Sequence, residues 1–143
     1  MSRSFHLQPG AAALVRSSFD RVLPHADDFA ARFYERLWSE HPELRALFAA
    51  TDMKRQRVML VKTLGFALGS LDWLAEITPA LEDLGRRHVR YGVQPSDYHA
   101  VGEALLWALE NTLGDAFTDE ARGAWSNVYA GLAAVMIGAS TAA

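Results

Sequence analysis

The stretch of sequence that decides the fold is Leu84-Gly85-Arg86-Arg87-His88-Val89-Arg90-Tyr91-Gly92-Val93. His88 lies four positions after Leu84, so both side chains lie on one face if the segment is helical. The Tyr91-Gly92 pair ends this helical pattern, and the cationic residues fall in its last turn, where they are favourable. By residue type alone, a single histidine on such a stripe is more often a core or solvated side chain than a ligand. The rest of the chain must decide which role His88 has.

The same spacing of apolar side chains by three and four residues runs along nearly the whole chain, and strict alternation of the strand type is hard to find. The pattern predicts a globular all-α fold of six or seven helices with short joints. Apolar stripes mark the predicted helices within residues 14–22, 29–38, 58–68, 79–88, 101–113 and 125–135, with a short turn at 42–48. Pro24 and Pro42 end the first two helices, and Thr51 and Asp52 are candidate caps for the third. The four tryptophans fall on or beside these stripes, so we predict core positions for them, with Trp73 semi-exposed.

Composition limits the functions that the chain can have. The 143 residues are half apolar, which fits one compact domain over residues 1–143. The 14 Lys and Arg against 17 Asp and Glu give a net charge of −3, which argues against a nucleic-acid partner. The absence of cysteine excludes disulfides, thiolate metal sites and cysteine nucleophiles. The chain has neither an apolar run of membrane-spanning length nor a signal pattern, so we expect a cytoplasmic protein with no membrane partner.

Few motifs in the chain carry chemistry. The sequence contains no nucleophile elbow, and its glycines form neither a phosphate loop nor a dinucleotide fingerprint. The five histidines stand at positions 6, 25, 41, 88 and 99, with no pair three or four apart on one helix face, so a protein-only metal site would need distant segments. Haem changes this argument. A porphyrin supplies four in-plane nitrogens, and one neutral imidazole from the chain is then enough to hold the iron.

Three further motifs accompany the segment around His88. They are Phe33-Tyr34 with the run from His41 to Phe48, Tyr98 with Val101-Gly102-Glu103, and Ala124-Trp125 with Tyr129. With the segment around His88 they resemble the globins, closest to neuroglobin, the bacterial single-domain haemoglobins and the globin half of flavohaemoglobins. The match covers residues from about 14 to 135, with short flexible termini outside it. The resemblance implies a globin-like fold of six to eight helices around a haem b pocket, with an irregular segment in place of one helix between Phe48 and Thr51.

The resemblance also implies roles for individual residues. His88 corresponds to the proximal ligand of the iron, and Phe48 to the ring that packs on the porphyrin face. For the distal position, the ungapped match places the distal and proximal residues 32 apart and selects Gln56, with Leu60 one turn further along. Matching the Val58-Met59-Leu60-Val61 string to neuroglobin instead selects Lys54.

On the same resemblance, Tyr34 corresponds to the tyrosine whose hydroxyl points at the bound ligand in bacterial haemoglobins. Leu84, Val93 and Tyr98 complete the set of expected haem contacts. Tyr98 matches a tyrosine that, in flavohaemoglobins, acts on the proximal histidine together with a glutamate near the end of the last helix. Here that end reads Met-Ile-Gly-Ala-Ser at 136–140, without a carboxylate, so the proximal triad is incomplete.

The resulting functional hypothesis is reversible binding of dioxygen, and of other diatomic gases such as CO and NO, at a b-type haem held by His88. A Tyr34 hydroxyl and a Gln56 amide that converge on the bound gas would each contribute on the order of 1–3 kcal/mol. The alternative is a nitric oxide dioxygenase, an enzyme in which the same two residues assist conversion of NO and O2 to nitrate and a separate reductase returns the electrons. A third alternative is a haem-free sensor or interaction module. The sequence leaves open whether the protein is a monomer or a homodimer.

Overall fold

Helices make up nearly all of residues 7–141, which the computed structural model describes. Their bounds, in chain order, are α1 Ala11–Val22, α2 Ala26–Glu40, α3 Met53–Gly69, α4 Leu74–Arg90, α5 Asp97–Leu113 and α6 Asp119–Thr141. Short 3₁₀ turns lie at Leu23–His25, Pro42–Phe48, Leu71–Trp73 and Gly114–Ala116. No strand occurs in this part of the chain, so the all-α prediction is confirmed. Short flexible termini were expected outside about 14–135, but residues 11–13 belong to α1 and residues 136–141 to α6. Residues 1–6, with His6, and 142–143 lie outside the described residues.

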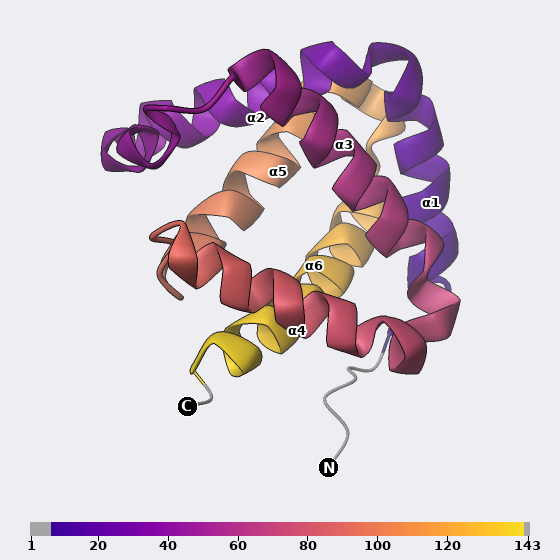
Figure 1. Cartoon of the computed structure of the whole chain (residues 1–143). Coiled ribbons are helices and arrows are strands. Elements are labelled where there is room, and N and C mark those ends of the chain that lie inside the picture. Colours follow the sequence, from indigo (N-terminus) through magenta and orange to yellow (C-terminus); the bar gives the residue numbers. More distant parts are fainter. Residues whose placement is uncertain (1–6, 142–143) are drawn as a thin grey trace.

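Three helix pairs build the fold. Helix α4 packs along α6, α2 packs along α5, and α1 packs along α6 (Figure 1). Helices α3 and α4 instead diverge from the turn Leu71–Trp73 that joins them, with a bend of 58° between them. No single helix in the described range is long and apolar enough to cross a membrane, and only this bent pair reaches the required length and composition.

The apolar core consists of a main cluster and smaller separate ones. The main cluster joins α1, α2, α5 and the first half of α6, and its fully buried members include Val15, Phe29 and Trp125. A second cluster consists of the buried residues Tyr98, Ala133 and Met136, with Leu84 and Val93 packed against them. Each large apolar side chain buried in this way stabilises the fold by roughly 1.5–3 kcal/mol. Both clusters include residues of α5 and α6, but the main cluster adds α1 and α2, whereas Leu84 of α4 packs on the second.

The start of α3 is fixed by a cap that the sequence predicts. The Asp52 carboxylate accepts hydrogen bonds from the backbone N–H groups of Lys54 at 3.1 Å and Arg55 at 3.4 Å. Such a cap satisfies donors that the first turn of a helix otherwise leaves free. Residues 49–52 before it form no helix, which agrees with the irregular segment expected between Phe48 and Thr51.

Three sequence-based expectations differ from the structure. Helix α4 begins at Leu74, so Pro79 lies inside it instead of near its start, and the Thr78 hydroxyl donates to the Leu74 carbonyl in the turn before the proline. Val58 and Phe66, expected on the apolar face of α3, are 49% and 54% exposed. Trp73, expected to be semi-exposed, is 61% exposed. Val58 and Phe66 lie on the outer face of α3, whereas Leu60 and Leu64 on its other face pack on the main cluster. Trp73 lies outside α3, in the turn Leu71–Trp73.

Candidate functional site

His88 lies in the last turn of α4, half-buried, with its ring orientation fixed by its own helix. The His88 Nδ1 atom is 2.7 Å from the Leu84 carbonyl oxygen. A carbonyl oxygen can only accept, so Nδ1 carries a proton, and in the neutral ring the lone pair is then on Nε2. This tautomer, with one ring nitrogen bonded to a carbonyl and the other available, is the form in which histidine binds metals.

The end of α4 is held in place behind His88. The backbone N–H of Val93 donates to the His88 carbonyl at 3.0 Å, and Gly92 takes a φ of 93°, which a residue with a side chain rarely adopts. A Cβ on Gly92 would also lie 3.0 Å from the Leu47 side chain, so the end of α4 is close to the turn that carries Phe48.

Helix α4 meets α6 at Gly85, three residues before His88. A Cβ at this position would lie 2.8 Å from the Met136 Cα and closer still to the Met136 carbonyl oxygen. These atoms are backbone, so they cannot move aside as a side chain would. Gly85 therefore sets how close α4 lies to α6, and with it the position of His88.

Tyr34 and Gln56 come together from two different helices. Tyr34 projects from α2 and is 4% exposed, and Gln56 projects from the first turns of α3. The Gln56 Nε2 donates to the Tyr34 hydroxyl oxygen at 3.0 Å. Burial raises the pKa of Tyr34, and the hydrogen bond from Gln56 lowers it by less. The phenol is thus a neutral donor whose own proton is not used in its bond with Gln56.

Aromatic rings surround the Tyr34 phenol. The Phe48 ring meets it edge-on at 5.5 Å between centroids, and the Trp38 ring lies 5.6 Å away. Leu60, one turn along α3 from Gln56, packs half-buried against the same main cluster. Lys54, the alternative distal residue, is exposed at the start of α3. Gln56, which we select from the ungapped match, is the one of the two residues that bonds Tyr34.

Leu84, Val93 and Tyr98 belong to the second apolar cluster, on the same side as His88. The Tyr98 and His88 rings are 6.3 Å apart between centroids. Burial raises the pKa of Tyr98, and its hydroxyl oxygen is buried with no hydrogen-bond partner in the described part of the chain. The Tyr98 carbonyl accepts instead, from the Tyr129 hydroxyl at 2.5 Å. Residues 136–140 contain no carboxylate, and the Tyr98 hydroxyl accordingly has no acceptor in the described part of the chain.

These residues fit a flat apolar cofactor that contains a metal. One set of half-buried apolar side chains belongs to the main cluster, another to the second cluster, and the second also carries an imidazole with a free Nε2. No group of three or more His, Asp or Glu residues within 7–141 could hold a metal ion directly. A cofactor that brings most of its own metal ligands, as a porphyrin does, needs only one such imidazole from the chain.

Sequence reasoning missed one pair of residues next to the distal donors. The Arg57 Nε lies 2.8 Å from the Asp27 carboxylate, which links α3 to the first turn of α2 beside the Gln56–Tyr34 hydrogen bond. The two residues are 30 positions apart, and neither belongs to a recognisable motif. Only the docking of the two helices reveals the ion pair.

Comparison with known proteins assigns the family. Residues 31–136 match the family described as Globin. The chain belongs to the globin family. This globin is 33% identical over 127 residues to a flavohemoprotein from Bacillus subtilis, and 37% identical over 126 residues to one from Vibrio cholerae. In both cases the match covers 87% of this chain and 32% of the relative, so the chain spans about a third of the length of these relatives.

A solved structure extends the comparison to three dimensions. It is an engineered carbene transferase, described as a putative nitric oxide dioxygenase from Rhodothermus marinus. The TM-score is 0.84 at 28% sequence identity, and the match covers 94% of each chain. The predicted globin-like fold is thereby confirmed.

Proposed function

We propose that this globin holds haem b through His88 and binds dioxygen and other diatomic gases reversibly. The observation that carries the proposal is the His88 imidazole, whose Nδ1 is bonded to the Leu84 carbonyl and whose Nε2 is left free, in a chain that also pairs a buried tyrosine with a glutamine. Membership of the globin family supports haem as the cofactor. When bound, haem supplies an iron atom with a coordination position for a small gas.

Side chains from both clusters would hold the haem group. His88 would ligate the iron, and Leu84, Val93 and Tyr98 would line the same side of the pocket. Phe48 and Leu60 would exclude water from the ligand side, which strengthens every polar interaction there.

Tyr34 and Gln56 would act on the bound gas. Gln56 donates to the Tyr34 oxygen, so the hydroxyl proton of Tyr34 remains available to a second acceptor. A polar diatomic ligand such as dioxygen is such an acceptor, and a hydrogen bond to it slows its release. Burial keeps Tyr34 protonated, so this donor is present at any pH below the raised pKa of the phenol.

The surroundings of His88 favour reversible binding over cleavage of the oxygen–oxygen bond. The partner of Nδ1 is a neutral carbonyl, and residues 136–140 offer no carboxylate to Tyr98. A carboxylate partner would raise the basicity of the imidazole and send more electron density to the iron. A neutral carbonyl partner leaves the imidazole a weaker donor, which suits a protein that releases its ligand unchanged.

Nitric oxide dioxygenation is the second candidate, favoured by the similarity to the Rhodothermus marinus protein. In this reaction NO and O2 combine to nitrate with uptake of one electron. Tyr34 and Gln56 would be the catalytic residues, because they hold the oxygen while NO reacts with it. The electron would come from a separate reductase, and the setting would be the cytoplasm, with the globin as a monomer or a homodimer.

The test is reconstitution with hemin followed by absorption spectra of the ferric, ferrous, CO-bound and oxygenated protein. The matched pair of variants is His88→Ala and His99→Ala, because His99 is an exposed histidine on the neighbouring helix α5. We expect one haem per chain and a reversible oxygenated spectrum for the wild type and His99→Ala, and loss of both for His88→Ala. A wild-type protein that takes up no hemin, or an unchanged His88→Ala spectrum, would refute the proposal. Rapid, repeated nitrate formation from NO in the presence of a reductase would select the enzyme.

A further inference from the structure

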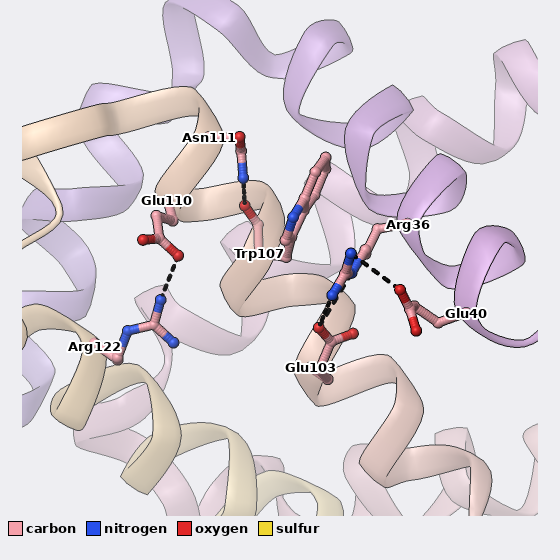
Figure 2. Close-up of polar contacts among 7 residues, drawn as sticks. All are labelled: Arg36, Glu40, Glu103, Trp107, Glu110, Asn111 and Arg122. Atoms are coloured by element: carbon pink, nitrogen blue, oxygen red, sulfur yellow. Dashed lines mark hydrogen bonds and ion pairs between the residues drawn. The ribbon is translucent and has the colours of Figure 1, made fainter.

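Helix α2, which carries Tyr34, is bound firmly to α5. Two residues along from Tyr34, the Arg36 guanidinium donates to the Glu103 carboxylate at 2.9 and 3.2 Å and lies 5.3 Å from the centre of the Trp107 ring (Figure 2). Glu40 bonds the same guanidinium at 3.1 Å. With α2 held in this way, the position of the Tyr34 hydroxyl is set by the packing of α2 on α5.

Helix α3, which carries Gln56, is held differently along its length. Its two buried residues, Ala67 and Leu68, are both at its C-terminal end, and the Arg16 side chain bonds the Leu68 carbonyl at 2.9 Å. The N-terminal half has no fully buried side chain. This half packs on the main cluster only through partly buried side chains, such as Met53 and Leu60. Such packing is weaker than that of fully buried side chains, so polar contacts contribute more to the position of Gln56.

Two adjacent residues of this half bond to α2. Gln56 bonds Tyr34, and Arg57 forms the ion pair with Asp27 at 2.8 Å. Neither Asp27 nor Arg57 belongs to the aromatic and apolar set around Tyr34, since Asp27 is 70% exposed and Arg57 27% exposed. The ion pair is therefore placed to hold α3 against α2 without touching a ligand.

We propose that the Asp27–Arg57 ion pair is a positioning device that keeps Gln56 hydrogen-bonded to Tyr34 and so sets how fast a bound gas leaves. This inference rests on the proposed function, which supplies the bound gas. The positioning of α3 by the ion pair does not depend on that function. Loss of the pair lets the N-terminal half of α3 move away from α2, which withdraws Gln56 from Tyr34. An ion pair this accessible to water shifts an equilibrium by at most about fivefold, and salt weakens it further.

The test compares Asp27→Asn and Arg57→Gln with Glu110→Gln. The last variant removes the Glu110–Arg122 ion pair, at 2.6 Å and similarly exposed, which joins α5 to α6 instead of α2 to α3 (Figure 2). In stopped-flow measurements on the haem-loaded protein, we expect dioxygen to leave about two to five times faster from the first two variants and at the wild-type rate from Glu110→Gln. Raising the salt concentration should speed release from the wild type and not from Asp27→Asn.

Two further measurements separate positioning from a general loss of stability. In a Gln56→Leu background, Asp27→Asn should no longer change the release rate, because the residue through which it acts is gone. Hydrogen exchange of the amides at 53–60 should be faster in Asp27→Asn than in the wild type and Glu110→Gln, with or without haem. Hydrogen exchange and dioxygen release at wild-type rates in Asp27→Asn would overturn the proposal. So would equally fast dioxygen release from Glu110→Gln, or an undiminished effect of Asp27→Asn on the release rate in the Gln56→Leu background. If the chain bound no haem, the proposed function would fail, and the exchange data would still decide whether the ion pair holds α3.

Discussion

Replacing Tyr34 by Phe removes one oxygen atom from the candidate distal side and keeps the ring. The Tyr34 ring contacts Phe48 and Trp38, so the aromatic cluster should survive the change. Two hydrogen bonds are lost, the one accepted from Gln56 and the one that we propose Tyr34 donates to the bound gas. The second bond acts on the gas directly and accounts for most of the change in ligand release. Loss of the first adds only the few-fold effect expected when Gln56 is displaced from Tyr34.

A hydrogen bond to a strongly polar acceptor in a dry pocket contributes about 1.5–3 kcal/mol. Because about 1.4 kcal/mol corresponds to a factor of ten, the dissociation rate of dioxygen should rise roughly tenfold to a hundredfold in Tyr34→Phe. Carbon monoxide, a less polar ligand, should be affected much less.

The assay is stopped-flow displacement of dioxygen by excess CO, followed in the visible spectrum. Tyr129→Phe is the matched control, because it also removes a tyrosine hydroxyl from a partly buried position, where it donates to the Tyr98 carbonyl. We expect dioxygen release from Tyr129→Phe at close to the wild-type rate. A wild-type release rate in Tyr34→Phe, or an equal increase in both variants, would refute the distal role of Tyr34.

Three further predictions concern the folded chain without its cofactor. In urea titrations, Gly85→Ala should lower the free energy of unfolding by about 1–3 kcal/mol, because the added Cβ would meet the backbone of α6. The added Cβ of Gly123→Ala meets nothing within 4 Å, so this variant should raise the free energy of unfolding by roughly 0.5–1 kcal/mol. Equal effects of the two substitutions would contradict the close contact between α4 and α6. Burial raises the pKa of Tyr34 and Tyr129 above the ordinary value of 10.0, so their phenol protons leave the unfolded chain at lower pH than the folded one. The free energy of unfolding should therefore be constant below about pH 9 and fall above about pH 10. A constant value through about pH 11 would contradict the burial of these phenols. Tyr98→Phe should leave the free energy of unfolding unchanged or raise it by up to about 1 kcal/mol, because the Tyr98 hydroxyl has no hydrogen-bond partner within residues 7–141. A clear loss of stability would show that this hydroxyl has a hydrogen-bond partner.

Helix content and the candidate site were accessible from the sequence for different reasons. The helices follow from apolar spacing and from turn residues such as Asp52, whose capping role depends on local geometry alone. The role of His88 was ambiguous from residue spacing alone. Its assignment as an iron ligand came from the resemblance of the surrounding residues to the globins. The resemblance also placed Gln56 and Tyr34 on one side of the pocket although they are 22 apart in sequence, but the hydrogen bond between them is visible only in the structure.

Other features depend on how helices dock, which no local pattern records. The stripe of α3 suggested that Val58 and Phe66 would be buried, but α3 packs on the core through another face, which carries Leu60 and Leu64. The start of α4 at Leu74 was missed because Pro79 is a common helix-opening residue, and here it is tolerated inside the helix. The Asp27–Arg57 ion pair has no sequence signal, because any of the many exposed charges could have been its partner.

The most direct test of the central claim, that His88 holds the iron, is the iron–imidazole stretching band in the resonance Raman spectrum of the ferrous, gas-free protein. We expect this band in the wild type and in His99→Ala. It should be absent from His88→Gly and return when free imidazole is added to that variant, because the small ligand can occupy the space that the side chain leaves. A band that persists unchanged in His88→Gly without added imidazole would show that another group binds the iron and would contradict the account.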